Sequence, residues 1–331
     1  MPASKAKPPR LLTTTAAELL QTAFAPVDYV IPGYIAEGLT VLAGRPKAGK
    51  SWMALDMAIA VALGSTALGS IQVSQADVLY LGLEDNARRL QRRIDQLAPA
   101  GALPDRLYLA TECPRLNEGG IEAIEQWCDD VTFPKLIVVD VFGKVRPERR
   151  QSESPYEADY RALEPLKQLA DRRRVAVLII HHTNKRDEPE DPFDAVSGTT
   201  GFTGAADTIL ILAKGPQGPT IYGRGRDIEE INTALRFNTS TGQWTALGDA
   251  TAVRRTDERK AILDVLLEAA EPLSPTEIAG AAGMKYANVK KLLGKMVTAG
   301  EVVKLKRARY CHPNHRPGVS PDHHDHQVTI Q

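Results

Sequence analysis

The sequence predicts an α/β fold built on a mostly parallel sheet, with hairpins at one edge of the sheet and a small helical unit towards the C-terminus. The main observation is a series of short apolar runs separated by segments with helical periodicity, for example residues 136–139 and 176–180. Continuous apolar runs are typical of parallel strands whose two faces are both covered by helices. After Ala205 the pattern changes to short strand-like segments that follow one another directly, which indicates edge hairpins.

The elements of this predicted sheet can be placed in order along the chain. A capping box from Thr15 to Glu18 predicts a short helix that ends near Phe24, after a basic arm at residues 1–12. The expected strands are residues 39–43, 77–83, 106–110, 136–139 and 176–180, followed by hairpin strands at 208–212, 220–223, 233–237 and 244–247. The expected helices are residues 51–63, 86–97, 120–130 and 155–174, from their helical spacing of apolar positions.

The C-terminal part predicts a second, smaller unit after a boundary near residues 248–256. Its expected helices are residues 257–269, a helix opened by a capping box at Ser274 with Pro275 at the first helical position, and residues 286–298. A basic hairpin at residues 301–310 follows, and this order of elements is typical of a winged helix. We therefore expect four regions: an N-terminal arm and short helix (1–27), the main α/β domain (28–250), a winged helix (256–311) and a tail (312–331).

Composition limits the function classes. The chain has 41 Lys and Arg residues and 41 Asp and Glu residues, so any binding to nucleic acid must come from local patches rather than from net charge. Three cysteines without paired spacing favour a reducing compartment and no disulfide framework. No apolar run approaches the roughly 20 residues that span a bilayer, and the N-terminus lacks the apolar core of a secretory signal. We expect a cytoplasmic protein with no membrane partner.

The strongest motif is a phosphate-binding loop (P-loop) at residues 44–51, between an expected strand and an expected helix. Its glycines let backbone N–H groups surround phosphate oxygens, and the helix N-terminus adds positive potential. We expect Lys50 to reach the β- and γ-phosphates and the Ser51 hydroxyl to bind Mg²⁺, so that ATP and Mg²⁺ are the predicted cofactors. The alternative is a coincidental glycine-rich turn. The residues assigned to nucleotide binding are Gly44, Arg45, Pro46, Lys47, Ala48, Gly49, Lys50, Ser51 and Trp52.

Carboxylates at the ends of two expected strands complete a candidate ATP-hydrolysing site. Asp140 closes an apolar strand and fits a residue that holds Mg²⁺ through water, although a strand-end Asp can also cap the next turn. Glu84 and Asp85 follow another strand, at the sheet edge where ligands collect. A carboxylate there can orient or deprotonate the attacking water. Alternatively, both side chains only favour the N-terminus of the next helix.

Four segments together resemble a known family, across roughly residues 28–247: 38–51, 81–85, 137–140 and 181–185. They are similar to the RecA/DnaB-type ATPases and, more narrowly, to the RepA-type hexameric replicative helicases of plasmids and their phage and prophage relatives. The resemblance implies a RecA-like fold, with Glu84 as the catalytic base and His182 as the γ-phosphate sensor. It leaves His181 open as the alternative to His182. Without the resemblance, the two histidines would be ordinary hydrogen-bonding residues at a strand end.

Arg224 and Arg226 are the candidate residues for a site shared between subunits. They lie one residue apart on an expected strand, so their side chains share a face, and arginine suits bidentate contacts to phosphate. The family uses such a pair to reach the γ-phosphate of the neighbouring subunit. The resemblance therefore implies catalytic roles for both arginines and a homo-oligomer, in the family a hexameric ring. The alternative is an ion-paired edge strand close to Asp227 and Glu229.

Basic residues indicate where DNA could bind. Lys144 and Arg146 follow the Asp140 strand, and Lys185 follows the histidines; in the family these loops face the central channel. Lys290 and Lys291 lie on the last expected helix of the winged helix. Lysine and arginine there could contact a phosphate backbone. The alternatives are solvated surface loops for the first group and a protein-docking module for the second.

These expectations give two functions. The first is ATP-driven translocation on single-stranded DNA by the replicative helicase of a plasmid, phage or prophage, with possible contact to duplex DNA through the winged helix. The second is a nucleotide switch that controls a winged-helix DNA-binding regulator and unwinds nothing. A metal site in the histidine-rich tail is not expected, because zinc needs paired ligands in an ordered fold. The residues considered for it were Cys311, His312, His315, His323, His324 and His326.

Overall fold

The computed structural model describes residues 11, 13–183, 191–195, 201–215 and 218–315. Within them, nine strands form one central sheet in the order β13-β12-β11-β10-β3-β9-β8-β6-β7. Neighbouring strands from β10 to β7 run parallel, and those from β10 to β13 run antiparallel. This is the predicted arrangement of a parallel sheet with edge hairpins. The strands are β3 (Gly38–Gly44), β6 (Asp77–Gly82), β7 (Leu107–Ala110), β8 (Pro134–Asp140), β9 (Ala176–His182), β10 (Thr208–Gly215), β11 (Gly218–Gly225), β12 (Ile231–Phe237) and β13 (Trp244–Asp249).

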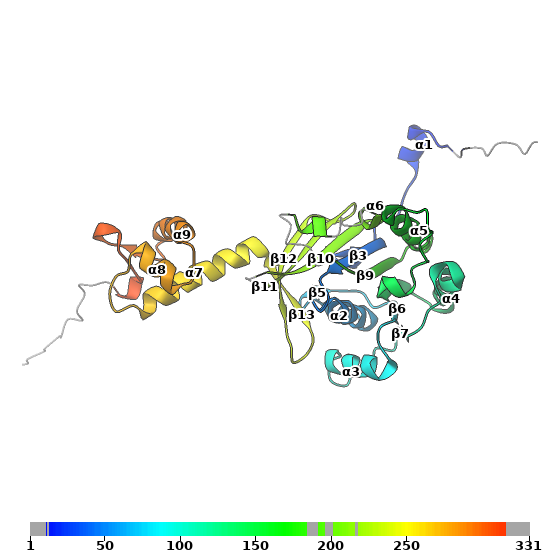
Figure 1. The fold of residues 1–331 in the computed structure, drawn as a ribbon, viewed down its shortest axis with the longest axis horizontal. Coiled ribbons are helices and arrows are strands. Elements are labelled where there is room, and N and C mark those ends of the chain that lie inside the picture. Colours follow the sequence, from blue (N-terminus) through cyan, green and yellow to red (C-terminus); the bar gives the residue numbers. More distant parts are fainter. Residues whose placement is uncertain (1–10, 12, 184–190, 196–200, 216–217, 316–331) are drawn as a thin grey trace, which may run out of the picture.

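Helices cover both faces of this sheet, which explains the continuous apolar runs in its strands (Figure 1). Helices α2 (Lys50–Leu63) and α3 (Ala87–Leu97) pack on one face, in a core that includes Leu42 and Val138. Helices α4 (Ile121–Asp130), α5 (Pro155–Arg173) and α6 (Gly201–Ala205) pack on the other, with Val41 and Val139. Alternate residues of a strand point to opposite faces, so each strand contributes to both cores.

Small elements precede and interrupt this sheet. Helix α1 (Ala16–Gln21) begins with the predicted capping box at Thr15, ends about one turn earlier than expected and buries no residue. Two short hairpins were not predicted, because strands of two or three residues give no periodic signal. They are formed by β1 (Tyr29–Ile31) with β2 (Ile35–Ala36), and by β4 (Thr66–Ala67) with β5 (Ile71–Gln72).

The C-terminal unit contains the expected elements in the expected order around a core of its own. They are α7 (Ala250–Glu268), α8 (Pro275–Ala281), α9 (Tyr286–Thr298), β14 (Val303–Lys304) and β15 (Tyr310–Cys311). The first helix begins earlier than the expected residue 257, because residues 250–256 form its first turns. The Asp249 side chain accepts a hydrogen bond from the Ala252 N–H, and Ala250 is fully buried. In Figure 1, α7 runs from the sheet to α8 and α9.

Two expectations lie outside the described residues: the loop around Lys185, and the tail histidines at 323, 324 and 326. Among the residues that are described, none of the helices combines the length and the apolar character needed to cross a membrane.

Candidate nucleotide-binding site

The P-loop leaves the end of β3, between β10 and β9, and leads directly into α2. Its first and last glycines cannot be replaced easily. Gly44 has φ 156°, and a Cβ there would lie 2.5 Å from the carbonyl oxygen of Leu212. Gly49 has φ 102°, and a Cβ there would lie 2.6 Å from the ring of Trp244. The loop is therefore packed closely at both ends, against Leu212 and Trp244. Its backbone amides lead into the N-terminus of α2, and a helix N-terminus is a favourable place for a phosphate.

Lys50 is held at the centre of this loop and is only 3% exposed. Its Nζ donates hydrogen bonds to the carbonyl oxygens of Gly44 at 2.7 Å and Arg45 at 2.9 Å, and it lies 3.1 Å from Nδ1 of His182. Burial lowers the pKa of Lys50 to about 8, against the opposing effect of the Asp140 and Glu84 carboxylates. Buried amines lose charge stabilisation from water, so an anionic phosphate is a favourable partner for this ammonium.

Ser51 and Asp140 form the candidate metal-binding pair. The Ser51 hydroxyl donates to Oδ1 of Asp140 at 3.0 Å, and the Tyr80 hydroxyl donates to Oδ2 at 2.7 Å. Burial raises the pKa of Asp140, while these two hydrogen bonds lower it. Burial also raises the pKa of Tyr80 well above its usual range, so its hydroxyl remains a donor. A hydroxyl and a carboxylate are hard oxygen ligands, so these residues fit Mg²⁺.

The neighbouring carboxylates Glu84 and Asp85 have different surroundings. The Asp85 side chain is 7% exposed and forms ion pairs with Arg89, at 3.0 Å, and with Arg93 on α3. Glu84 is exposed, and its charge raises the pKa of both Lys50 and His182. Of the two carboxylates, Glu84 is therefore the more accessible to solvent, and Asp85 is the one engaged in ion pairs.

The two histidines at the end of β9 point to opposite faces. His182 lies beside Lys50 with part of its side chain exposed, and the desolvation of its other part and the Lys50 charge lower its pKa. His181 stacks on Phe202 of α6 with ring centroids 4.0 Å apart, and burial lowers its pKa to about 4. Strand alternation explains the difference, because consecutive side chains face opposite sides of the sheet. His182, the residue selected by the resemblance, is the one that lies at the P-loop.

Comparison with known proteins places this geometry in a family. Residues 5–188, more than half of the chain, match the family described as "AAA domain". This chain belongs to the AAA domain family. Given its P-loop, the protein is an ATPase.

Two solved structures show the same fold as this AAA domain protein. One is described as an "ATPase Domain", with a TM-score of 0.55 and 14% identity, covering 70% of this chain and 95% of that chain. The other is "The Structure Of A DnaB-Like Replicative Helicase And Its Interactions With Primase", with a TM-score of 0.52 and 13% identity, covering 69% of this chain. The chain covers 66% of that second protein's length. These likenesses confirm the predicted RecA-like fold class.

Arg224 and Arg226 do not lie at the P-loop of their own AAA domain. Through β10, Arg224 is level with Val41, three residues and therefore about 10 Å before the P-loop along the strand direction. Arg224 forms ion pairs with Asp191 at 2.8 Å and with Glu230 at 3.1 Å. The side chain of Arg226 is 67% exposed and lies 3.6 Å from Asp207. The structure keeps these two arginines apart from the other predicted catalytic residues of the same chain.

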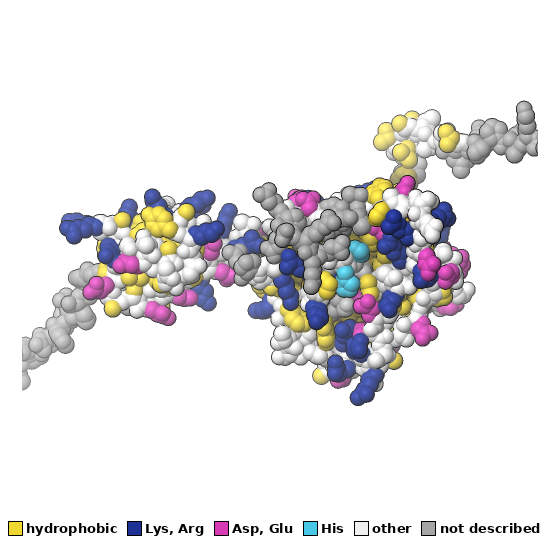
Figure 2. Space-filling model, viewed as in Figure 1, with side chains coloured by type: hydrophobic (Ala, Val, Ile, Leu, Met, Phe, Trp, Pro, Cys, Tyr) yellow, Lys and Arg dark blue, Asp and Glu magenta, His cyan; other side chains and the backbone are white. Residues whose placement is uncertain are grey.

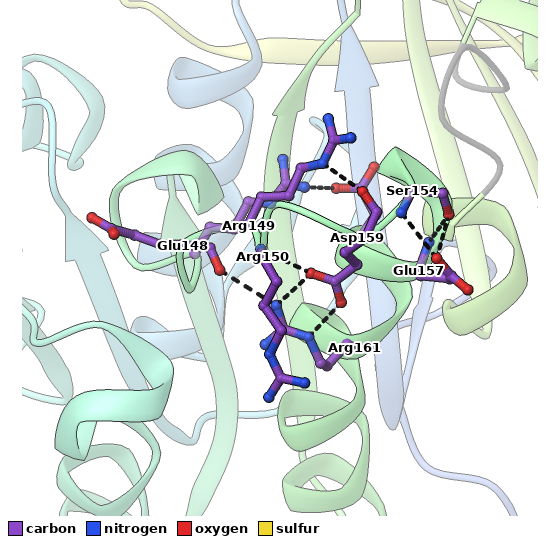
Figure 3. A network of polar contacts seen from close by, with 9 residues as sticks. Glu148, Arg149, Arg150, Ser154, Glu157, Asp159 and Arg161 are labelled. Carbon is purple, nitrogen blue, oxygen red and sulfur yellow. Dashed lines mark hydrogen bonds and ion pairs between the residues drawn. The ribbon is translucent and has the colours of Figure 1, made fainter.

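Arg146, one of the residues expected to contact DNA, forms an ion pair within the protein. Its guanidinium pairs with Asp159 of α5, which is 1% exposed. The loop that follows is tied to the start of α5, as the close-up in Figure 3 shows: Arg149 donates to the Glu153 carbonyl, and Arg161 forms an ion pair with the Glu153 side chain. The Arg146 side chain is 32% exposed, but its charge is already paired with a buried carboxylate.

The other predicted DNA-binding residues that the structure describes are accessible. Lys144 ends a short 3₁₀ turn (Phe142–Lys144) and is exposed. Lys290 and Lys291 are exposed on α9, whose buried residues Val289 and Leu292 face the core of the C-terminal unit. Figure 2 shows Lys and Arg side chains spread around the rim of this unit. DNA contact by these lysines stays a prediction.

Two aromatic residues at the site were missed from the sequence, and the assignment of Trp52 to nucleotide binding stays a prediction. The Trp52 ring packs edge-on against Phe237, with the Arg93 guanidinium 5.2 Å from its centre. Tyr80 and Trp244 instead contact Asp140 and Gly49. Their strands pack beside the P-loop only in the folded chain, and their sequence pattern is that of ordinary apolar strand residues.

Proposed function

We propose that this protein is an ATP-driven motor on single-stranded DNA that acts as a replicative helicase. The observation that carries the proposal is the convergence of Lys50, Ser51, Asp140, Glu84 and His182 at one end of the sheet. The fold around them matches ATPase domains that include one from a DnaB-like replicative helicase. An origin in a plasmid, phage or prophage and a cytoplasmic location belong to the same proposal.

The chain's own residues divide the work of hydrolysis. Backbone amides of the P-loop and the Lys50 ammonium bind and orient the phosphates. Ser51 and Asp140 would hold Mg²⁺, which supplies charge neutralisation at the phosphates when bound. Glu84 orients the attacking water and accepts its proton, since a carboxylate at the sheet edge can serve as a general base. His182, beside Lys50, would contact the terminal phosphate and report its loss.

We include a homo-oligomer, in the form of a hexameric ring, in the proposal. Arg224 and Arg226 lie away from the P-loop of their own chain, so they could act only on the nucleotide of a neighbour. Their acidic partners Asp191, Glu230 and Asp207 would exchange for phosphate oxygens in the ring. Arginine supplied in trans stabilises charge that develops in the transition state.

DNA would contact lysines. Lys144 is exposed in the turn after β8, Lys185 follows β9 in the chain, and Lys290 and Lys291 are exposed on α9 of the C-terminal unit. Lys144 and Lys185 suit a single strand in the channel of a ring, and α9, as part of a winged helix, suits duplex DNA. The internal ion pair of Arg146 removes that residue from the proposed contacts.

One observation favours a second function, the nucleotide switch without unwinding. Trp244 packs on Gly49 of the P-loop, and its strand β13 continues without a break into α7, the first helix of the C-terminal unit. A change at the P-loop could therefore be transmitted to a DNA-binding unit in the absence of translocation. Unwinding activity distinguishes the two functions.

The deciding experiment combines ATP hydrolysis with strand displacement. Purified full-length protein with Mg²⁺-ATP should hydrolyse ATP faster when single-stranded DNA is added, and should displace a labelled strand from a forked duplex. Lys50→Ala is the control and should show neither activity. Hydrolysis and duplex binding without strand displacement would leave the nucleotide switch as the function. Turnover of Lys50→Ala within about threefold of wild type, less than ~0.7 kcal/mol in the barrier, would contradict the P-loop assignment.

A mixing experiment tests the shared site. Arg226→Ala should bind ATP and hydrolyse it poorly, and Lys50→Ala should fail within its own site. Mixed together, the two variants can form interfaces with an intact P-loop on one side and an intact arginine on the other. Activity should partly return and should depend on total protein concentration. A mixture that co-assembles in sedimentation and yet stays inactive would contradict the ring proposal.

A further inference from the structure

Tyr80 is a buried polar residue that the proposed function does not use. It lies in the middle of β6 and is 0% exposed. Its hydroxyl lies 2.7 Å from Oδ2 of Asp140 and 3.4 Å from the carbonyl oxygen of Ser51. The hydroxyl has one proton, and the shorter contact to a charged acceptor is the stronger hydrogen bond. Tyr80 therefore donates to the carboxylate proposed to hold Mg²⁺.

The strands position this contact through their register. β6 and β8 are parallel neighbours in which Tyr80 pairs with Val138 and Gly82 pairs with Asp140. Residues 80, 82 and 140 consequently lie on the same face of the sheet, the face covered by α2. Gly82 lies between Tyr80 and the level of Asp140, and a Cβ on it would lie 3.1 Å from Leu90 and 3.4 Å from the Tyr80 ring. The Tyr80 ring therefore passes close over Gly82 on its way to the carboxylate.

The Asp140 carboxylate is thereby held at both oxygens. Ser51 donates to Oδ1 at 3.0 Å and Tyr80 to Oδ2 at 2.7 Å. A serine hydroxyl can bind a cation through its oxygen while its proton is donated elsewhere, so the Ser51 contact suits the metal-bound state as well. The Tyr80 contact fixes the plane of the carboxylate independently of Ser51. Residues that orient metal ligands in this way usually affect metal affinity strongly.

We propose that Tyr80 is a positioning residue that holds Asp140 in the orientation needed to bind the Mg²⁺ of the Mg²⁺-nucleotide complex. This inference rests on the proposed metal role of Ser51 and Asp140, and it does not depend on helicase activity. The competing explanation is that Tyr80 only fills the core and that its hydroxyl donates to the nearest acceptor. The two explanations differ in whether loss of the hydroxyl changes the Mg²⁺ requirement.

The test is Tyr80→Phe, which removes one oxygen and keeps the ring. Binding of a fluorescent ADP analogue to full-length protein is measured as Mg²⁺ is raised from micromolar to tens of millimolar, so that no turnover enters the readout. The half-saturating Mg²⁺ concentration should rise about tenfold, the lower range for loss of a residue that orients a metal ligand. Affinity for the analogue in EDTA should stay within about twofold of wild type, because P-loop and Lys50 contacts remain.

Tyr34→Phe is the matched control. The Tyr34 hydroxyl donates to Thr233 at 3.0 Å in the β1–β2 hairpin region, and its removal should leave the Mg²⁺ titration unchanged. A double variant shows whether Tyr80 acts through Asp140: in an Asp140→Asn background, Tyr80→Phe should produce less than about a twofold further shift.

Three results would overturn the proposal. They are a Mg²⁺ requirement of Tyr80→Phe within about twofold of wild type, a full additive shift in the Asp140→Asn background, and loss of Mg²⁺-free nucleotide binding together with a lowered unfolding temperature. The last result would make Tyr80 a core-packing residue. A wild-type protein that hydrolyses ATP but does not unwind DNA would contradict the helicase proposal and leave the Tyr80 test intact.

Discussion

Asp56→Asn should stabilise the ATPase unit, and the gain should depend on pH. Asp56 lies on α2, and its carboxylate accepts a hydrogen bond from the Trp244 backbone N–H at 3.2 Å. Burial raises the pKa of Asp56 from its usual 3.8 to about 6, although this hydrogen bond opposes the rise. Asparagine keeps an oxygen acceptor for the N–H and removes the buried charge. The contact matters for the site, because Trp244 packs against Gly49 of the P-loop.

The size of the effect follows from the two pKa values. The folded state binds the proton more tightly than the unfolded state, so ionisation of Asp56 destabilises the fold as pH rises. This destabilisation is small below pH 4, grows between pH 4 and 6, and is complete above pH 6. A difference of about 2.2 pKa units, from 6 minus 3.8, corresponds to about 3 kcal/mol at pH 7.5 and roughly half of that at pH 5.

Urea unfolding at these two pH values measures the effect. Asp56→Asn should raise the free energy of unfolding by up to about 3 kcal/mol at pH 7.5, and its advantage over wild type should shrink by roughly half at pH 5. Asp105→Asn, at an exposed aspartate of the same unit, is the control and should follow wild type at both values. An Asp56→Asn variant that is less stable than wild type, or equally stabilised at both pH values, would refute this reasoning.

The remaining predictions concern the site and the C-terminal unit. Glu84→Gln should bind nucleotide normally and lose at least about 100-fold in turnover, because the amide cannot accept a proton, whereas Asp85→Asn should keep most activity. Steady-state hydrolysis and nucleotide binding are measured on both variants, and an inactive Asp85→Asn beside an active Glu84→Gln would make Asp85 the catalytic base. His182→Ala should lower turnover at unchanged unfolding temperature, and His181→Ala should lower that temperature by several degrees, since it removes the stacked ring. Deletion of residues 256–331 should leave basal hydrolysis intact and weaken duplex DNA binding at matched salt; equal dissociation constants would instead favour a protein-docking role for the C-terminal unit.

The sequence by itself determined the order of elements and the central motif. The P-loop, the strand before it and the helix after it are local features, since glycine positions and hydrophobic periodicity are properties of neighbouring residues. The expected helix at 286–298 coincides with α9, and Gly64 ends α2 as predicted. The helix expected from residue 257 begins at Ala250 instead, because the Asp249 cap and the burial of Ala250 extend α7 towards the sheet.

Only the three-dimensional structure showed how the surroundings of neighbouring candidate residues differ. Glu84 and Asp85 look equivalent in sequence until α3 forms and its Arg89 and Arg93, four and eight residues further along, pair with Asp85. The two histidines at the end of β9 become distinct only when the faces of the sheet are known. The contacts of Tyr80 with Asp140, and of Trp244 with the P-loop, join residues that are far apart in the chain. Strand order and register create these contacts, and neither leaves a local pattern in the sequence.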